Sequence, residues 1–412
     1  MDPSSSFISL DQIAGAGLGP LAQHLDAYIA VVREQGYLPA TARKHVRLIA
    51  KFSQWLRRRR FEPHDLDESL VGRFLRQLWK AHPVERDDRA TLTRLLSVLR
   101  QQGATPDKQS SPSPRRRITA GYRRYLLDER GLSPATARNY LPYIERFLSE
   151  RFGQGRLNLA QLRAPDVTSF LQRYLSNSTP RRGGKVIVTA LRSFLGHLRH
   201  QGKIRTDLAA CIPSVASWSF ASLPKFISGD DVQKVLRSCD QQTAVGRRNY
   251  AILLLLARIG LRANEVAGLN LEDIDWDNAR ISIRAKGGQR SRLPLPADVG
   301  EAIAHYLRRD RPRCSCRRVF IRQHAPWMGF ADSTAISMVA RRALETSGVD
   351  SAHKGAHVLR HSLATSMLRR GASLEEIGEL LRHKSPNTTA LYAKVDLAAL
   401  RPLGLPWPGG VQ

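Results

Sequence analysis

Cysteine, long hydrophobic runs and acidic side chains are all scarce in this sequence. The 412 residues include four cysteines, too few for a disulfide framework, so we expect a protein of the reducing cytoplasm. The apolar run Ala251–Leu256 is far shorter than the about 18 residues of a membrane-spanning helix, so we expect no membrane association. The opening Met-Asp-Pro-Ser-Ser-Ser lacks the basic and then apolar layout of a secretory signal. Secreted and membrane-spanning proteins are therefore poor matches.

The shortage of acidic residues leaves a large positive charge. The chain has 65 lysines and arginines against 36 aspartates and glutamates, which gives a formal net charge of +29 and a pI near 10.9. An excess of this size indicates a polyanionic partner, most simply nucleic acid bound through its phosphates. An anionic membrane surface is the rival partner, and the lack of a long apolar run argues against it.

Two short motifs resemble metal sites without completing them. Cys314–Cys316 (Cys-Ser-Cys), with His324 nearby, lacks the second ligand pair of a zinc site. Asp273–Asp277 alternates aspartates as a calcium loop does. However, Asn278 stands where that loop needs glycine, and Arg284 where it needs a bidentate glutamate. We therefore expect neither a metal nor another bound cofactor.

The length of the chain predicts several domains, because 412 residues exceed the size at which a single core keeps growing. Apolar residues recur with a helical period through residues 15–103, which predicts a first all-helical module. Residues 104–114 are rich in proline and serine and predict a linker before a second all-helical module at 115–210. A polar break at 211–224 then precedes a third domain at 225–412.

The first two modules contain a repeated sequence. Three segments of the first recur in the second, in the same order and 95 to 99 residues later: Gly36–Arg43 and Gly131–Arg138, Val71–Leu75 and Val167–Leu171, and 99–103 and 198–202. Because order and spacing hold across all three, we predict two related helical modules in tandem.

The third domain has the strongest strand pattern in the chain. Apolar residues alternate with other residues in Ile281–Ile283 and again in Leu293–Leu295, and Gly287 and Gly288 between them suggest a turn. This pattern predicts an antiparallel hairpin. Val319–Ile321 suggests a further strand. Helical periodicity fills the rest, so we predict a mainly α fold with a small antiparallel β-sheet in this domain.

The stretch from His357 to Tyr392 gathers the most informative side chains. His357 and Arg360 share one helix face, because positions i and i+3 lie on the same side of a helix. Gly371 predicts the end of that helix, and Ser373–Glu376 forms a capping box that predicts the start of the next. Two helices and the segment after them would bring these side chains together.

These side chains have the chemistry of phosphoryl transfer. Arginine binds phosphate oxygens bidentately, histidine moves protons near neutral pH, and tyrosine can act as a nucleophile. A single His-x-x-Arg pair or tyrosine is more often structural, so the prediction depends on residues upstream. We predict one arginine at a helix start and one lysine at the hairpin tip. The candidate site residues are Arg262, Lys286, His357, Arg360, His383 and Tyr392.

The order and spacing of these residues resemble the phage-integrase-like tyrosine recombinases, a family of site-specific recombinases. The resemblance rests on six separated positions within about 225–395, and the second module resembles the family's SAM-like core-binding domain. Together with the repeat, it predicts two tandem SAM-like modules before the catalytic domain, of which the first is an addition to the family's minimal architecture. Arg382 stands before His383 where the family commonly has glycine. Lys354 is a second candidate for the role of the catalytic lysine assigned to Lys286.

The resemblance implies cleavage and rejoining of double-stranded DNA through a covalent 3′-phosphotyrosine, without metal or ATP, as in integration or transposition of mobile elements. Tyr392 would attack the phosphodiester while Arg262 and Arg360 bind its oxygens. Lys286 would protonate the leaving 5′-oxygen as a general acid.

The remaining polar groups and the tail have supporting roles in this hypothesis. His357 and His383 would bind the phosphate or move the tyrosine proton, whereas His361 is expected to be structural and Glu265 to orient a neighbour. The resemblance also implies a homo-tetramer on DNA. The apolar C-terminal tail of the chain, residues 397–412, is expected either to dock on a neighbouring protomer or to pack on its own domain.

Two other functions remain open at the level of sequence. A type IB topoisomerase would share this chemistry but relax DNA without exchanging partners, and two helical modules before the catalytic domain favour the recombinase. A non-catalytic DNA-binding protein would need the charge but not the six site residues. The residues specify neither the target DNA site, nor the direction of the reaction, nor any accessory protein.

Overall fold

Helices dominate the computed structural model, and the mainly α fold is confirmed. The structure describes residues 19–81, 87–107, 113–153, 155, 157–176, 182–214, 225–284, 290–383 and 385–395. The chain divides into two compact units. One unit combines the N-terminal helices with the C-terminal domain, and the other contains the helices between them.

The N-terminal helices enclose a core of their own. Pro39 occupies the first turn of its helix, where the missing N–H would have had no intrahelical partner. Tyr28, Phe52 and Phe74 are buried at the centre. The elements are η2 (Ala22–His24), α1 (Leu25–Glu34), α2 (Pro39–Arg58), η3 (Pro63–Asp65), α3 (Glu68–Ala81) and α4 (Asp88–Gln101).

The second unit has a separate core. Ser113 and Ser133 cap the first two long helices by accepting hydrogen bonds from backbone N–H groups. Tyr122, Phe147 and Phe170 are buried between the helices. The elements are α5 (Pro114–Arg124), the π-helix η4 (Tyr125–Glu129), α6 (Pro134–Phe152), η5 (Leu159–Gln161), α7 (Ala164–Ser176) and α8 (Arg182–His200).

The repeated sequence occupies equivalent places in the two sets of helices. Helices α2 and α6 each begin at the proline of the repeat, three residues after a glycine with positive φ. These glycines, Gly36 (φ +79°) and Gly131 (φ +57°), adopt a left-handed conformation that other residues rarely take. A second pair of left-handed glycines, Gly103 and Gly202, follows α4 and α8. The repeat thus marks the same helix starts and ends in both sets.

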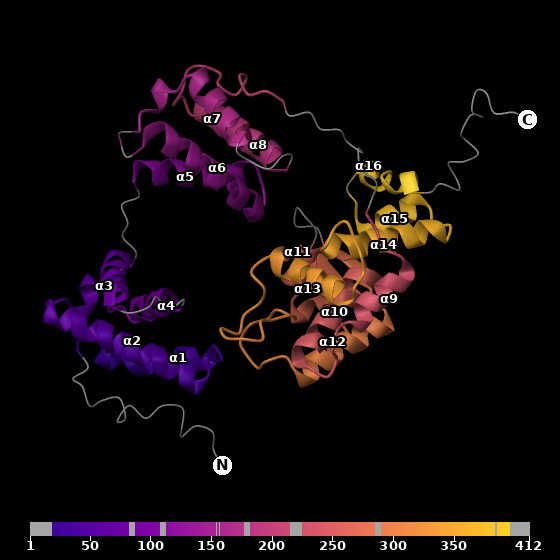
Figure 1. The fold of residues 1–412 in the computed structure, drawn as a ribbon, viewed down its shortest axis with the longest axis horizontal. Coiled ribbons are helices and arrows are strands. Elements are labelled where there is room, and N and C mark those ends of the chain that lie inside the picture. The colour runs from indigo at the N-terminus through magenta and orange to yellow at the C-terminus, as the bar shows by residue number, and fades with distance from the viewer. Residues whose placement is uncertain are drawn as a thin grey trace, which may run out of the picture. The chain divides into compact units, whose positions relative to one another are not determined.

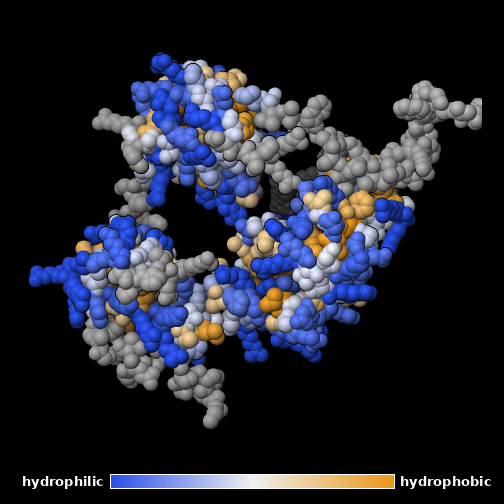
Figure 2. Space-filling view, viewed as in Figure 1, coloured by the Kyte–Doolittle hydropathy of each residue, from blue (hydrophilic) through white to orange (hydrophobic). Residues whose placement is uncertain are grey.

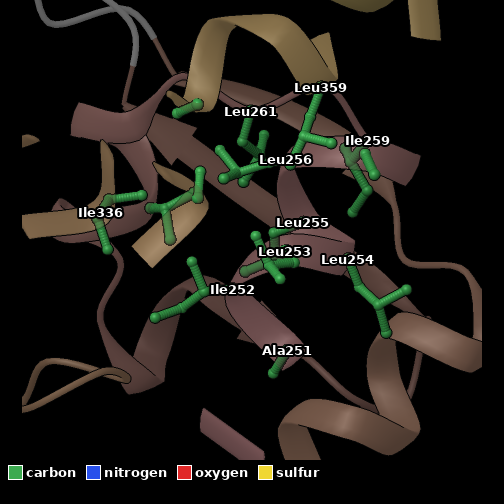
Figure 3. Packing of buried hydrophobic residues seen from close by; sticks show 14 of the residues in the cluster. Ala251, Ile252, Leu253, Leu254, Leu255, Leu256, Ile259, Leu261, Ile336 and Leu359 are labelled. Atoms are coloured by element: carbon green, nitrogen blue, oxygen red, sulfur yellow. The ribbon is translucent and has the colours of Figure 1, made fainter. Parts of the chain in front are cut away.

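The C-terminal domain is built around α10. Its residues Ala251–Leu256 are at most 1% exposed, so the apolar run of the sequence is a core helix buried on all sides. Figure 1 shows α10 among α9, α11, α12 and α13, and Figure 3 shows the packed side chains around it, including Ile336 and Leu359. The helices are α9 (Gly229–Arg237), α10 (Ala244–Arg258), α11 (Ala263–Gly268), η6 (Leu271–Asp273), α12 (Ala297–Arg309), α13 (Ser333–Thr346), α14 (Ala356–Arg369), α15 (Leu374–Leu381), α16 (Pro386–Thr389) and η7 (Tyr392–Val395).

The predicted hairpin is present in a three-stranded antiparallel sheet of order β1-β2-β3. Strands β2 (Arg280–Arg284) and β3 (Arg290–Pro294) pair with Ile281 opposite Leu293, and the turn between them lies outside the described residues. Strand β1 (Ile274–Asp275) completes the sheet and was not predicted, because two residues are too short to show an alternating pattern.

The prediction of a strand at 319–321 is wrong. Two isolated bridges flank this segment, Arg318 with Asn270 and Ile321 with Gly329, and the N–H of Val319 donates to the carbonyl oxygen of Leu269. These residues are apolar because they are buried beneath α12 and its neighbours, not because they join the sheet.

The N-terminal helices contact the C-terminal domain within their shared unit. The N–H of Trp327 donates a hydrogen bond of 2.9 Å to the carbonyl oxygen of Gln35. The Trp327 ring covers Gly36 so closely that a Cβ there would lie 2.2 Å from it. Gly36 is therefore required both by its backbone conformation and by this contact.

Hydrophilic side chains cover most of the visible surface (Figure 2). Within the described residues, no helix has the length and hydrophobicity that crossing a bilayer requires.

Candidate active site

Five of the six predicted site residues lie in the described part of the C-terminal domain. Arg262 precedes α11, His357 and Arg360 lie on α14, His383 follows α15, and Tyr392 opens η7. Lys286 falls at 285–289, outside the described residues, so its place in the site stays a prediction.

Local sequence signals set the ends of the helices that carry these residues. Helix α14 ends just before Gly371 (φ +89°), as predicted from that glycine. The side chain of Ser373 accepts a hydrogen bond from the N–H of Glu376, whose carboxylate accepts one from the N–H of Ser373, so the predicted capping box opens α15. The short connection makes α14 and α15 neighbours and brings His383 back toward Arg360.

Arg360 is buried and anchored by backbone. Its two terminal nitrogens donate to the carbonyl oxygens of Gly260 and Leu381. Gly260 has φ +66°, and a Cβ on it would lie 2.7 Å from Leu381 Cδ2. A glycine is therefore needed where the chain turns to meet this guanidinium.

Arg262 is held by a buried carboxylate. Its Nη1 lies 2.9 Å from Oε1 of Glu265, and its Nη2 donates to the carbonyl oxygen of Arg382 at 3.1 Å. The other oxygen of Glu265, Oε2, accepts from Nη2 of Arg382 at 2.8 Å. The side chains of Glu265 and Arg382 are 5% and 7% exposed, whereas that of Arg262 is 36% exposed. Glu265 thus orients two guanidiniums, and Arg262 presents its outer part to solvent.

The arginines outnumber the acid that pairs with them, and this sets the electrostatics of the site. Burial, together with Arg262 and Arg382, lowers the pKa of Arg360 to about 10. Burial also lowers the pKa of the Arg382 guanidinium, and Glu265 opposes that effect. One carboxylate cannot neutralise three guanidiniums, so a bound phosphate would relieve their mutual repulsion. The arrangement is an anion site.

Tyr392 lies beside this anion site as a buried phenol. It is 1% exposed, and burial raises its pKa to about 12, although the charges of Arg360 and Arg262 act in the opposite direction. Its hydroxyl forms a hydrogen bond of 2.7 Å with Nδ1 of His361. The tyrosine is therefore protonated near neutral pH, and two guanidiniums act on it electrostatically.

The predicted histidines differ in their surroundings. Nδ1 of His383 lies 2.8 Å from the hydroxyl of Thr389, and its ring is parallel to that of Tyr392 with centroids 6.3 Å apart. Burial, Arg360 and Arg262 lower the pKa of His383 to about 4, so it is neutral near pH 7. His357 is exposed at the first turn of α14, where it can reach a ligand from solvent.

Sequence reasoning missed two residues of this site. His361 was expected to be structural, yet it contacts the candidate nucleophile. Its position four residues after His357 places both on one helix face, and this spacing could have identified it. Arg382 was noted merely as a replacement for glycine. It does adopt the left-handed conformation (φ +54°) that favours glycine, and its side chain turns inward onto Glu265.

The described residues contain no group of three or more His, Cys, Asp or Glu side chains placed to hold a metal ion. The groups present can bind an anion, supply a nucleophile and exchange protons. Together they can bring a phosphate and a tyrosine into contact.

Comparisons with known proteins agree with this chemistry. Residues 225–398 match the phage integrase family, and residues 120–202 match the phage integrase N-terminal SAM-like domain. The y4rA protein of Sinorhizobium fredii, named as an integrase/recombinase, is 47% identical over 397 residues, which cover 96% of each chain.

Solved structures share the fold. The XerH site-specific recombinase, bound to palindromic difH substrate in a post-cleavage complex, has a TM-score of 0.54 at 20% identity, covering 81% of this chain and 93% of that one. The lambda integrase tetramer bound to a Holliday junction has a TM-score of 0.50 at 17% identity, covering 75% of this chain and 88% of that one.

Proposed function

Since the chain belongs to the phage integrase family of tyrosine recombinases and is a site-specific recombinase that acts on DNA, we propose that Tyr392 is its nucleophile and that Arg262 and Arg360 bind the phosphate under attack. The observation that carries this proposal is one buried tyrosine that packs against the helix bearing Arg360, with its hydroxyl hydrogen-bonded to the residue next to that arginine. Each such contact to the developing charge typically contributes about 3 to 4 kcal/mol to lowering the barrier.

The proposed reaction is a transesterification. The phenol oxygen of Tyr392 forms a bond to phosphorus as the bond from phosphorus to the 5′-oxygen breaks, which leaves a 3′-phosphotyrosine and a free 5′-hydroxyl. The phenol proton leaves as the new bond forms, and the 5′-oxygen takes up a proton. Because the number of phosphoester bonds is unchanged, rejoining by a 5′-hydroxyl needs neither ATP nor a metal ion.

We assign the remaining roles by position. Lys286, on the hairpin that joins β2 and β3, would protonate the leaving 5′-oxygen. His357, exposed at the start of α14, would hydrogen-bond a phosphate oxygen from the solvent side. His383, held by Thr389, would do so from within the site.

The domain organisation fits a protein that encloses duplex DNA. We propose that the module at 115–210, which contains the SAM-like match, and the catalytic domain at 225–412 both bind the duplex. We propose that residues 15–103 form a second SAM-like module, because the repeated sequence begins and ends the same helices in both. It would contact further DNA or a partner subunit.

We propose that the active assembly is a homo-tetramer on two DNA duplexes, acting in the cytoplasm on mobile elements during integration or transposition. The lambda integrase tetramer, which shares this fold, is bound to a Holliday junction. The tail at 397–412 would dock on a neighbouring protomer. It lies outside the described residues, as do residues 215–224 of the linker predicted at 211–224.

The proposal is tested by trapping the protein on DNA. The full chain is incubated with sheared host genomic DNA, denatured, and the fragments that remain covalently attached are sequenced. We expect fragments that share one sequence motif, and none with Tyr392→Phe, which should still bind DNA. Fragments without a common motif, together with relaxation of any supercoiled plasmid, would indicate a topoisomerase instead. The absence of covalent complexes from the wild-type protein would contradict the proposed chemistry.

A further inference from the structure

The hydroxyl of the proposed nucleophile already has a proton acceptor. Nδ1 of His361 lies 2.7 Å from the hydroxyl oxygen of Tyr392, at the distance of a strong O–H···N hydrogen bond. The two rings are 5.6 Å apart at an interplanar angle of 55°, so the contact is made through the ring nitrogen and not by stacking. The phenol is the donor in this pair when the imidazole is neutral with its proton on Nε2.

The surroundings of His361 keep its imidazole neutral. The ring lies on α14 one residue after Arg360 and one turn after His357, with 6.2 Å between the two histidine rings. Burial, together with His357, Arg360 and His353, lowers the pKa of His361 to about 4. A neutral ring has one nitrogen free to accept a proton, and in the tautomer with its proton on Nε2 that nitrogen is Nδ1, which faces Tyr392.

His383 makes a different contact with the same tyrosine. Its Nδ1 lies 2.8 Å from the Thr389 hydroxyl, and its ring is within 5° of parallel to the phenol ring. Its bonded nitrogen is therefore committed to Thr389, whereas that of His361 is committed to the nucleophilic oxygen. The geometry thus reverses the expectation from the sequence, in which His383 was a site residue and His361 was structural.

We infer that His361 is the general base of the reaction, accepting the proton of Tyr392 as the phenol oxygen attacks phosphorus and returning it when the DNA strand is rejoined. This inference rests on Tyr392 being the nucleophile, as proposed above. In the forward step the O–H bond of Tyr392 breaks, a bond forms between its oxygen and phosphorus, and the proton ends on Nδ1 of His361. The 5′-oxygen leaves and is protonated by a separate acid.

A weakly basic imidazole is suited to this concerted transfer. Before attack the phenol holds its proton much more tightly than His361 would. Once its oxygen is bonded to phosphorus, that oxygen is far more acidic than an imidazolium. The pKa of His361 therefore lies between the pKa of the phenol oxygen before attack and its pKa after bonding to phosphorus. Under this condition proton transfer accompanies bond formation. A DNA phosphate would also offset part of the positive charge from the arginines and so make His361 a better acceptor.

The test replaces the acceptor without removing the hydrogen bond. In His361→Asn the amide oxygen occupies the place of Nδ1 and can still accept a hydrogen bond, but it cannot take up a proton. We expect the rate of covalent complex formation on a trapped DNA site to fall about 100-fold or more, with DNA binding unchanged. Cleavage by His361→Asn at the wild-type rate would overturn the inference.

A more acidic nucleophile provides the decisive control. A fluorinated tyrosine at position 392 loses its proton more easily, so it should restore much of the rate to His361→Asn. It should not restore the rate of His383→Asn, in which the imidazole bonded to Thr389 is removed. Equal rescue of both variants, or of neither, would overturn the inference.

The outcome is distinguishable from failure of the proposed function. Covalent complexes that persist in Tyr392→Phe would show that another residue is the nucleophile. If Tyr392→Phe forms no covalent complex but His361→Asn forms it at the wild-type rate, the proposed function stands and the role of His361 is refuted. Should His361→Asn not fold, tyrosines of graded acidity at position 392 of the otherwise wild-type chain provide the test. With His361 as acceptor, the pH above which the rate of covalent complex formation becomes constant should not change with the pKa of the phenol. If it does change, solvent and not His361 removes the proton.

Discussion

The two halves of the active site are held by different means. The arginine half consists of Arg262, Glu265, Arg360 and Arg382, and the tyrosine half of His361, His383 and Tyr392. The arginines are fixed by a buried carboxylate and by four backbone carbonyls, those of Gly260, Leu380, Leu381 and Arg382. The phenol is held by one neutral imidazole. The arginine half is therefore held in place by contacts within the protein, whereas the proposed nucleophile is a protonated phenol beside it.

The energies of these contacts explain the difference. Hydrogen bonds to charged groups typically contribute about 1.5 to 3 kcal/mol each, and the arginine half has several of them. A hydrogen bond between neutral groups contributes about 0.5 to 1.5 kcal/mol, and Tyr392 has one such bond with His361. The hydrogen bond that holds the Tyr392 hydroxyl is thus weaker than those that hold the arginines.

Removing the nucleophile should have the largest effect. Tyr392→Phe keeps the buried ring but loses the oxygen that would bond to phosphorus, so we expect no covalent complex at all. DNA binding should be retained because the arginine half is untouched. Gel electrophoresis of denatured samples measures the first property and a mobility-shift assay the second. Loss of binding along with cleavage would mean that the two halves do not act separately.

Changing the shape of the buried arginine should have the next largest effect. A lysine in Arg360→Lys keeps the charge but cannot donate to the carbonyls of both Gly260 and Leu381. We expect the cleavage rate to fall about 100- to 1,000-fold, as when a donor to the developing charge is removed.

Arg370→Lys provides the matched control, because Arg370 is exposed at the end of the same helix. It should cleave DNA at the wild-type rate. Similar losses in both variants would contradict a specific role for the buried guanidinium.

Removing the shared carboxylate should affect stability more than removing one of its partners. Glu265→Gln leaves the buried guanidinium of Arg382 without a charge partner, and we expect a loss of about 3 to 5 kcal/mol in the free energy of unfolding. Arg382→Gly removes that charge and relaxes a left-handed backbone position, so its loss should be smaller. Denaturant unfolding of the full chain measures both. Equal losses would show that the carboxylate does not hold the arginine half together.

Acid should weaken the tyrosine half. His361 and His383 titrate near 4 in the folded chain against 6.5 for an ordinary histidine. The unfolded chain therefore binds protons first, and stability is lost as the pH falls from about 6.5 to about 4. Each histidine contributes up to about 1.4 kcal/mol per pH unit in that window. His361→Asn should make the decline shallower; an unchanged slope would mean that this ring is not kept neutral by the fold.

Much of the arginine half could be predicted from the sequence. Local signals placed Arg262 at a helix start and Arg360 on the face of a helix, because capping residues and periodicity report local structure. The bonds from Arg360 to Gly260 and Leu381 could not be predicted, because they join residues 100 and 21 positions apart. Such contacts depend on how helices pack, which no local pattern reports.

The tyrosine half shows the limit more clearly. Tyr392 and His383 were proposed as site residues from their spacing, but the hydrogen-bond partner of the phenol was not predicted. His361 lies beside Arg360 in sequence, and its direction depends on how η7 packs against α14. The strand predicted at 319–321 failed for a related reason, since buried loops and buried strands can have the same apolar composition.

The most direct test of the account is to identify the residue that becomes bound to DNA. Covalent complexes trapped on genomic DNA are digested with nuclease and trypsin, and the modified peptide is sequenced by mass spectrometry. We predict a nucleotide attached through a 3′-phosphate to Tyr392, in the peptide Ser385–Lys394. Attachment to any other side chain, or cleavage without attachment, would contradict the assignment of the phenol beside Arg262 and Arg360 as the nucleophile.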